Sequence, residues 1–252
     1  MRFDIVSLFP EMFNAFLTNG ITRRAFESGQ VEVKLFNPRD FTSGSYRRVD
    51  DRPFGGGPGM IMMAEPLKLC LQEIRSQRLE SPPVVLFSPV GRQLNHAMVT
   101  DWAQSRGAVL ICGRYEGLDQ RFIDAHVTDQ ISLGDFVLSG GEIPAMALLD
   151  AVARLQPGVL SAADSHQQDS FNPALDGLLD CPHYTRPEIW SETGVPEILL
   201  SGHHEQIERW RRQQRLAMTA RWRPELIDQA RRAGKLSSVD EAFLSGSVCG
   251  AS

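Results

Sequence analysis

Short apolar runs alternate with helical patterns through the first 155 residues of the chain. Runs with the composition of β-strands are "FDIVSLF", "VEVKLF", "VVLFSP", "AVLICG" and "HVTDQISLG". Between or after them lie segments with helical spacing: "PEMFNAFL", "AEPLKLCLQEIRSQ", "NHAMVTDWAQSRG", "LDQRFIDA" and "EIPAMALLDAVARL". Strands and helices that alternate in this way favour a largely parallel sheet with helices on both faces. We therefore expect an α/β fold in this part of the chain.

The chain changes character after this region. Residues 156–180 are polar and irregular, as in a linker or an active-site loop. Helical patterns return beyond residue 200, in "HHEQIERWRRQQRLAMTARW", "PELIDQARRAG" and "VDEAFLSG". We expect three parts: an α/β domain over 1–160, a linker or active-site loop over 161–178, and a small helical domain over 179–252. The tail "SGSVCGAS" has no recognisable pattern, and we expect it to be disordered.

Bulk composition is that of an ordinary folded protein, with 42% hydrophobic and 23% charged residues among 252. The four cysteines form no CxxC pair, which indicates reduced thiols rather than a zinc site or a disulfide framework. No apolar stretch reaches the roughly 18 residues of a membrane span. We expect a cytoplasmic protein that does not bind membranes.

Charge is unevenly distributed along the chain. The formal net charge is −5, yet residues 201–235 carry nine basic and four acidic side chains. A second basic run with an aromatic residue, "SYRRVDDR", occupies 45–52. Such runs are compatible with solvated helix faces and also with a surface that faces RNA.

Glycine-containing loops follow three of the expected strands. These loops are "SPVGR" (88–92), "CGRYEGLDQR" (112–121) and "LGDFVLSGGEIP" (133–144). Ligands of open parallel sheets bind at the carboxyl ends of the strands. Phosphate cradles usually add a basic residue to glycine, but "ISLGDFVLSGGE" has none, and "FGGGPGM" (54–60) fits neither a P-loop nor GxGxxG. The pattern favours an uncharged or cationic adenosine-like ligand, as S-adenosylmethionine would be.

Longer strings carry a resemblance to a known family. They are "DDRPFGGGPGM" (50–60), "GRYEGLDQR" (113–121), "ISLGDFVLSGGE" (131–142), "DSF" (169–171), "LLDCPHYTRPE" (178–188) and "SGHHEQIERWR" (201–211). In this order the chain resembles the bacterial tRNA (guanine-N1)-methyltransferases of the TrmD family, within the SPOUT superfamily. The resemblance implies a parallel-sheet α/β fold with a deep trefoil knot, a homodimer, and S-adenosylmethionine as methyl donor. It also implies, as substrate, the guanosine 3′ of the anticodon (tRNA position 37).

The resemblance also implies particular site residues. Those matched to cofactor contacts are Phe87, Ser88, Pro89, Gly91, Gly113, Tyr115, Glu116, Gly117, Leu133, Gly134, Asp135, Phe136, Val137, Leu138, Gly140, Gly141 and Pro144. Glu116 could instead be a solvated loop acid. Ser139 and Glu142 fit an S-x-x-E capping box for the following helix, which favours a structural role for Glu142.

Methyl transfer to guanine N1 requires a base for the ring proton and a cation for charge that builds toward O6. Asp169 matches the family's general base, and Arg154 matches the residue aimed at the guanine. Without the resemblance, we would interpret Asp169 as a loop or capping residue. We would interpret Arg154 as a cation that complements the partial negative charge of a helix C-terminus. An ordinary aspartate, with a pKa near ~3.9, is a weak base, so burial beside the substrate would have to raise that pKa.

RNA contacts are expected from the two basic regions. The candidates are Arg47, Arg48, Arg52, Trp210, Arg211, Arg212 and Arg215. Magnesium use is implied by the resemblance, but no cluster of metal-ligand residues is apparent. Two alternatives remain open at this stage: a ribose 2′-O-methyltransferase of related fold, and a non-catalytic RNA-binding module.

Overall fold

The computed structural model describes residues 1–160 and 165–248. The chain divides into two compact units, Met1–Ser161 and Ala162–Ser252. Residues 161–164 of the expected linker, and 249–252 of the tail, lie outside the described residues.

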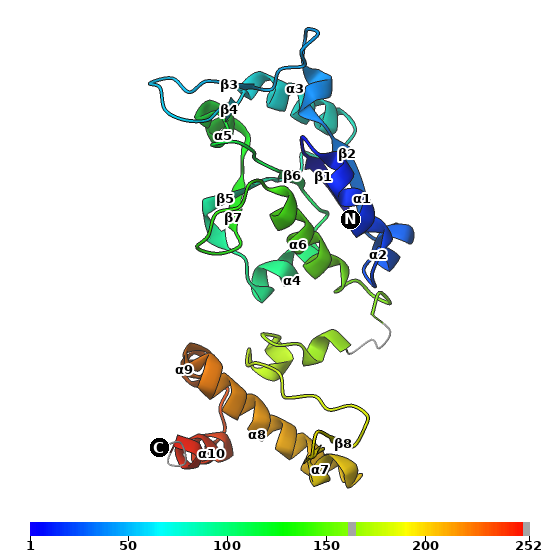
Figure 1. Ribbon diagram of the computed structural model, residues 1–252, viewed down its shortest axis with the longest axis vertical. Helices are drawn as coiled ribbons and strands as arrows, with labels where there is room; N and C mark the ends of the chain where they lie inside the picture. The colour runs from blue at the N-terminus through cyan, green and yellow to red at the C-terminus, as the bar shows by residue number, and fades with distance from the viewer. Residues whose placement is uncertain (161–164, 249–252) are drawn as a thin grey trace. The chain divides into compact units, whose positions relative to one another are not determined.

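The first unit is built around a five-stranded sheet in the order β2-β1-β6-β5-β7 (Figure 1). The strands are β1 (Arg2–Val6), β2 (Glu32–Phe36), β5 (Val84–Gln93), β6 (Val109–Ile111) and β7 (Asp129–Ser132). Every neighbouring pair is parallel. The expectation of an α/β fold with a central parallel sheet is therefore confirmed.

Helices cover both faces of this sheet (Figure 1). They are α1 (Phe13–Thr18), α2 (Arg23–Glu27), α3 (Ala64–Ser76), α4 (His96–Gln104), α5 (Gln120–His126) and α6 (Glu142–Ala153). Apolar residues of α1, α2, α4 and α6 form one buried cluster with the sheet, and those of α3 and α5 form another. Short 3-10 turns, η1 (Pro10–Met12) and η2 (Pro38–Phe41), occupy two of the connections.

Strand β5 illustrates why the apolar runs are continuous. Val84 and Leu86 pack with α3 and α5, whereas Val85 and Phe87 pack on the opposite face. Successive side chains of a strand point to opposite faces, so a strand covered on both sides needs apolar residues at every position. The same alternation holds in β6, where Val109 lies in one cluster and Leu110 in the other.

The pairing of β5 with β7 is irregular. Ile131 of β7 lies opposite both Phe87 and Arg92, so residues 88–91 of β5 leave the regular ladder between these two positions. Gly91 closes this excursion, and a Cβ atom built on it would lie 2.4 Å from the backbone nitrogen of Ile131. Backbone thus passes directly against backbone at the carboxyl end of β7.

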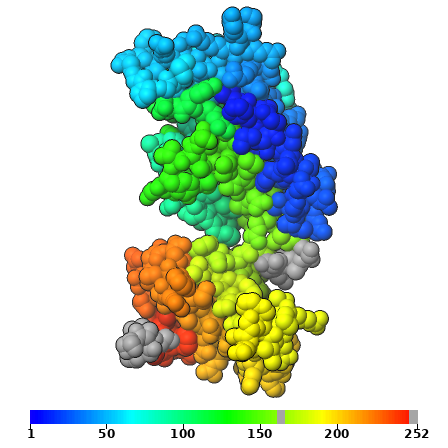
Figure 2. Space-filling view, in the orientation of Figure 1, coloured from blue at the N-terminus to red at the C-terminus, as the bar shows by residue number. Residues whose placement is uncertain are grey.

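A small hairpin extends the first unit beyond its main sheet. Strands β3 (Asp50–Asp51) and β4 (Ile61–Met62) pair antiparallel and enclose the loop 52–60. Figure 1 shows this loop projecting past α5, and it stands out in light blue at the surface in Figure 2. The sequence patterns did not predict these two strands, which are too short to carry a periodic signal.

The second unit contains four α-helices and a hairpin among its described residues. The helices are α7 (Glu197–Leu200), α8 (His204–Trp222), α9 (Pro224–Arg232) and α10 (Ser238–Val248). The hairpin pairs β8 (Ile189–Trp190) with β9 (Thr193–Gly194), and η3 (Ser165–Gln168) and η4 (Pro173–Leu175) precede it. A small apolar core includes Leu178, Leu216 and Leu244. Because α10 runs to Val248, the prediction of a disordered tail is wrong for residues 245–248.

No helix within 1–160 or 165–248 is long and apolar enough to cross a membrane.

Candidate active site

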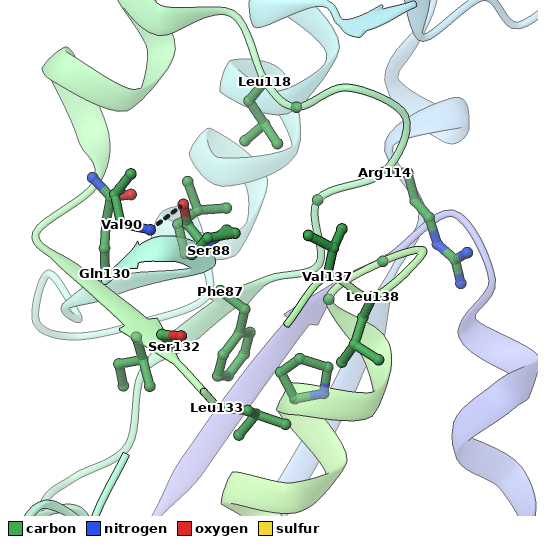
Figure 3. Close-up of a pocket in the computed structure, with 18 of the residues that line it drawn as sticks. Phe87, Ser88, Val90, Arg114, Leu118, Gln130, Ser132, Leu133, Val137 and Leu138 are labelled. Carbon is green, nitrogen blue, oxygen red and sulfur yellow. Dashed lines mark hydrogen bonds between the residues drawn. The ribbon is translucent and has the colours of Figure 1, made fainter. Parts of the chain in front are cut away.

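A cavity of about 470 Å³ lies at the carboxyl ends of β5, β6 and β7. Its walls come from the excursion of β5, from the loop after β6 and from the loop after β7. Figure 3 shows Phe87, Leu133, Val137 and Leu138 around the apolar part of this space. The three glycine-containing loops of the sequence therefore meet in one pocket.

The structure brings the predicted cofactor residues together at this pocket, with two exceptions. All of them line the cavity except Gly91 and Asp135. Gly91 is packed against β7, and Asp135 is exposed.

Several lining residues were missed by the sequence analysis. They include Leu86, Gln130, Ile131 and Ser132, which lie outside the loops at 88–92, 112–121 and 133–144. Gln130 and Ser132 belong to β7 itself, and they reach the cavity because β5 leaves the ladder beside them. An irregular strand pairing has no signature in a single sequence, so no pattern could have pointed to them.

Close backbone packing sets the shape of the pocket floor. A Cβ atom on Gly141 would lie 2.6 Å from the Cα of Cys112, at the end of β6. A Cβ atom on Gly140 would lie 2.3 Å from the Arg114 Nε. Glycine is required at Gly141 because its neighbours are backbone atoms, whereas a side chain at Gly140 would displace the Arg114 side chain.

Glu142 has a different role from the expected one. Gly141 is the N-cap of α6 and no side chain caps the helix, so the predicted capping box with Ser139 is wrong. The Glu142 carboxylate is buried, accepts a hydrogen bond from Ser7 Oγ at 2.7 Å and pairs with Arg114 Nη2 at 2.9 Å. The helix begins two residues later than a Ser139 cap would require, and the buried Glu142 carboxylate instead lies against Arg114, which lines the pocket.

Arg114 is the only lysine or arginine that lines the cavity within the described residues. Its guanidinium points away from the space in Figure 3, toward Glu142 and the Ser139 carbonyl, to which Nη1 donates at 3.2 Å. The guanidinium also lies 4.6 Å from the centre of the Phe9 ring. This arginine fixes the loop after β7 and contributes little positive charge to the cavity.

The loop after β6 is tied to the β3–β4 hairpin. Glu116 N donates to the Met60 carbonyl at 3.0 Å, and Met62 N donates to the Gly117 carbonyl at 2.8 Å. Tyr115 adopts a left-handed φ of 60°. Burial raises the pKa of the Tyr115 phenol above its ordinary value, and the charge of Asp50 raises it further.

The two predicted catalytic residues belong to different units. Arg154 ends α6 as its C-cap, with its backbone nitrogen bonded to the Asp150 carbonyl at 3.1 Å. Asp169 follows η3 and donates its backbone N–H to the His166 carbonyl at 3.3 Å. Both residues are half-buried.

Helix α8 supports the chain that follows Asp169. Leu179 N donates to Thr219 Oγ at 3.0 Å, and the Asp180 carboxylate pairs with Arg215 at 3.4 Å. Asp180 N in turn donates to Ser170 Oγ at 2.9 Å. Through these bonds α8 holds both ends of the turn that begins next to Asp169.

Arg212 and Arg215 form ion pairs with aspartates of the second unit. The Arg212 guanidinium binds both carboxylate oxygens of Asp240, at 3.1 and 3.0 Å, and an oxygen of Asp176 at 2.9 Å. Arg215 is only 8% exposed. The expectation that these two arginines touch RNA phosphate rested on their place in a basic run, and the structure gives each of them carboxylate partners within the unit.

The other predicted RNA contacts are accessible. Arg47 pairs with Asp40 at 3.2 Å and Arg48 with Asp51 at 3.7 Å, but these exposed pairs are weak and readily exchanged. Arg211 pairs with Glu208 at 2.6 Å, and Trp210 stands near Tyr184 with ring centroids 6.3 Å apart. No group of three or more His, Cys, Asp or Glu side chains within 1–160 and 165–248 could hold a metal ion.

A parallel α/β sheet with a glycine-lined pocket at its strand ends defines a ligand-binding α/β protein of the open-sheet class. The particular family follows from comparison: the model for tRNA (guanine-1)-methyltransferase TrmD matches residues 1–229, and the chain belongs to this family. This membership identifies an enzyme of tRNA methylation, as the resemblance of its motifs predicted.

Named relatives agree over nearly the whole chain. A tRNA (guanine-N(1)-)-methyltransferase of Albidiferax ferrireducens is 78% identical over 248 residues, which is 98% of this chain and 100% of the relative. Proteins of the same name are 71% identical in Polaromonas sp., over 97% of this chain and 96% of the relative, and 68% identical in Paracidovorax citrulli, over 97% of both.

Proposed function

We propose that the chain transfers the methyl group of S-adenosylmethionine to N1 of the guanosine 3′ of the anticodon in tRNA. The observation that carries this proposal is the pocket at the ends of β5, β6 and β7. Its volume of about 470 Å³ suits a ligand of nucleoside size. Its walls offer backbone amides, carbonyls and apolar side chains, and its one arginine is engaged with Glu142. Such walls suit a ligand with a sulfonium better than a phosphate ester.

Asp169 would act as the base that removes the N1 proton, and Arg154 as the cation that meets charge on guanine O6. A proton must leave N1 before the ring nitrogen can attack the methyl group, and positioned carboxylates serve this purpose. A cation at O6 stabilises charge that develops in the transition state. The target nucleotide would be flipped out of its stack, at a cost of a few kcal/mol.

A homodimer is proposed from the exposed apolar residues beside the pocket. Val90, Phe136, Val137 and Ile143 are exposed by 80%, 56%, 85% and 51%. Exposed apolar groups gathered at one edge are typical of a protein interface. A second copy covering this edge fits the dimer that SPOUT enzymes form. The trefoil knot of that fold is proposed for the same region, where residues 88–91 pass against β7.

RNA binding is proposed for the exposed Arg47, Arg48 and Arg52 and for the half-buried Trp210 and Arg211. Arg212 and Arg215 would contribute indirectly, through the turn that follows Asp169. Because phosphate contacts release counterions, binding of tRNA should weaken steeply with salt although the chain is acidic overall. The residues described form no magnesium site, so no step of this proposal uses the metal.

Asp169→Asn is the test of the catalytic assignment. We expect turnover on an anticodon stem-loop to fall at least about 100-fold, the lower range for loss of a positioned base. S-adenosylmethionine binding, measured by calorimetry, should stay within about twofold. Asp101→Asn, which changes an exposed carboxylate on α4, is the matched control and should retain activity.

Nucleoside mass spectrometry of the product completes the test. A methyl group on guanine N1, and none when the guanosine is replaced by adenosine, is the expected result. A methyl group on ribose would establish the 2′-O-methyltransferase alternative. Binding of RNA without any methyl transfer by the unaltered protein would establish a non-catalytic module.

A further inference from the structure

Phe54 is exposed to an extent that folding does not explain. Its side chain is 99% exposed, at the start of the loop 52–60 between β3 and β4. Burial of a phenylalanine ring normally stabilises a folded protein, because apolar surface is removed from water. A ring left wholly in water by the fold is available to a partner.

Backbone conformation sets the shape of this loop. Gly55, Gly56, Gly57 and Gly59 all have left-handed φ values, of 86°, 78°, 121° and 78°. No atom lies within 4 Å of a Cβ built at the first three, so these glycines are not required by close packing. Consecutive left-handed residues carry the loop outward from the hairpin, and Figure 2 shows it at the surface in light blue.

The base of the loop is joined to the pocket. The Met60 carbonyl accepts from Glu116 N at 3.0 Å, and Met62 pairs with Leu118 in an isolated bridge. Glu116 and Leu118 both line the cavity. A Cβ atom on Gly59 would collide with the Glu116 side chain at 2.4 Å. The carboxyl-terminal end of the loop that carries Phe54 therefore lies at the pocket rim.

The segment that leads to Phe54 carries three arginines, Arg47, Arg48 and Arg52, against two acids, Asp50 and Asp51. Arg52 is exposed, and no carboxylate in the described part of the chain forms an ion pair with its side chain. Arg48 pairs with Asp51 only at 3.7 Å and is 64% exposed. An exposed aromatic ring in the same short segment as accessible arginines is typical of surfaces on which unpaired bases stack.

We propose that Phe54 stacks on a base of the RNA loop next to the target nucleotide. Removal of the target base from its stack exposes the faces of its neighbours, and an exposed ring on an arm at the pocket rim could cover one of them. This inference rests on the proposed function, because it takes the pocket as the site of methyl transfer.

The test uses Phe54→Ala in the full chain with an anticodon stem-loop that contains 2-aminopurine on either side of the target. We expect RNA affinity to fall about tenfold, the effect of losing one stacked base. Fluorescence quenching of one of the two probes should be lost. Phe54→Trp should restore both signals, and affinity for S-adenosylmethionine should not change in either variant.

Leu79→Ala is the matched control. Leu79 is a fully exposed apolar residue that precedes β5, at the amino edge of the sheet and opposite the pocket. It should change neither RNA affinity nor quenching. Unchanged RNA affinity and quenching in Phe54→Ala would overturn the proposal.

Two further outcomes are decisive. If Phe54→Ala converts a dimer to a monomer in sedimentation while RNA affinity is kept, the loop is a protein interface and the proposal is wrong. Failure of the proposed function gives a different result: the unaltered protein would not bind S-adenosylmethionine or would not methylate guanine N1, whatever residue 54 is.

Discussion

At the scale of single residues, Gly91 decides whether β5 and β7 can pack as they do. A Cβ atom at this position would lie 2.4 Å from Ile131 N and 2.5 Å from the Gln130 carbonyl carbon. Both atoms are backbone and cannot move aside without breaking the ladder. We expect Gly91→Ala to lower the free energy of unfolding by about 3 kcal/mol, at the upper end for overpacking. Urea unfolding followed by circular dichroism measures it.

Gly194→Ala is the control for this prediction. Gly194 has no neighbouring atom within 4 Å of its built Cβ, and it does not adopt a left-handed φ. Its replacement should change the unfolding free energy by less than about 0.5 kcal/mol, as at an ordinary surface site. Equal effects of the two substitutions would show that the backbone of β5 can yield at Gly91.

At the scale of elements, the junction of α8 and α10 depends on one carboxylate. Arg212 and the Ser237 amide hold the pKa of Asp240 at about 2, below its ordinary value of 3.8. A lowered pKa means that the folded state binds this proton less readily than the unfolded state. The stabilisation is therefore complete above about pH 4 and is lost as the pH falls toward 2, with a size of about 2 kcal/mol.

Asp240→Asn tests this pH dependence. The unfolding free energy of the second unit, followed by tryptophan fluorescence in a Trp102→Phe background, should be lower than that of the parent at pH 6. The difference should shrink by about 2 kcal/mol between pH 4 and pH 2. Trp102 is removed because it is the tryptophan of the first unit, whereas Trp190, Trp210 and Trp222 report on the second. A difference that does not vary with pH would contradict the assignment.

At the scale of the whole molecule, the exposed apolar residues Val90, Phe136, Val137 and Ile143 are the proposed dimer interface. Ile143 is 51% exposed on the first turn of α6 and does not line the cavity. If a second copy covers it, Ile143→Glu would bury a charge without a partner and should abolish the dimer. Analytical ultracentrifugation should then find a monomer, with methylation reduced at least tenfold.

Ile189→Glu, in the second unit, is the matched control for Ile143→Glu. Ile189 is 67% exposed in β8, so the substitution makes the same change of charge outside the apolar edge. It should leave the sedimentation coefficient of the dimer unchanged. A monomeric parent protein, or a dimer that survives Ile143→Glu, would show that this edge is not the interface.

The sequence by itself determined the α/β class and the family. Both are read from local patterns: apolar runs that alternate with helical segments, and glycine strings placed directly after strands. Position after a strand is sufficient to bring such loops together, because parallel strands end at one edge of a sheet. For this reason the loops at 88–92, 112–121 and 133–144 were placed at one site without knowledge of any contact.

Only the tertiary structure decided the partners of the charged residues. Glu142 pairs with Arg114 and Ser7, and Arg212 with Asp176 and Asp240, across separations that no local pattern encodes. The capping motif was misleading here, and the basic run did not reveal the carboxylate partners of its arginines, since each pattern describes what a side chain could do near its own position. The energy of an ion pair depends on the distance between its charges and on burial, and both are set by the path of the chain.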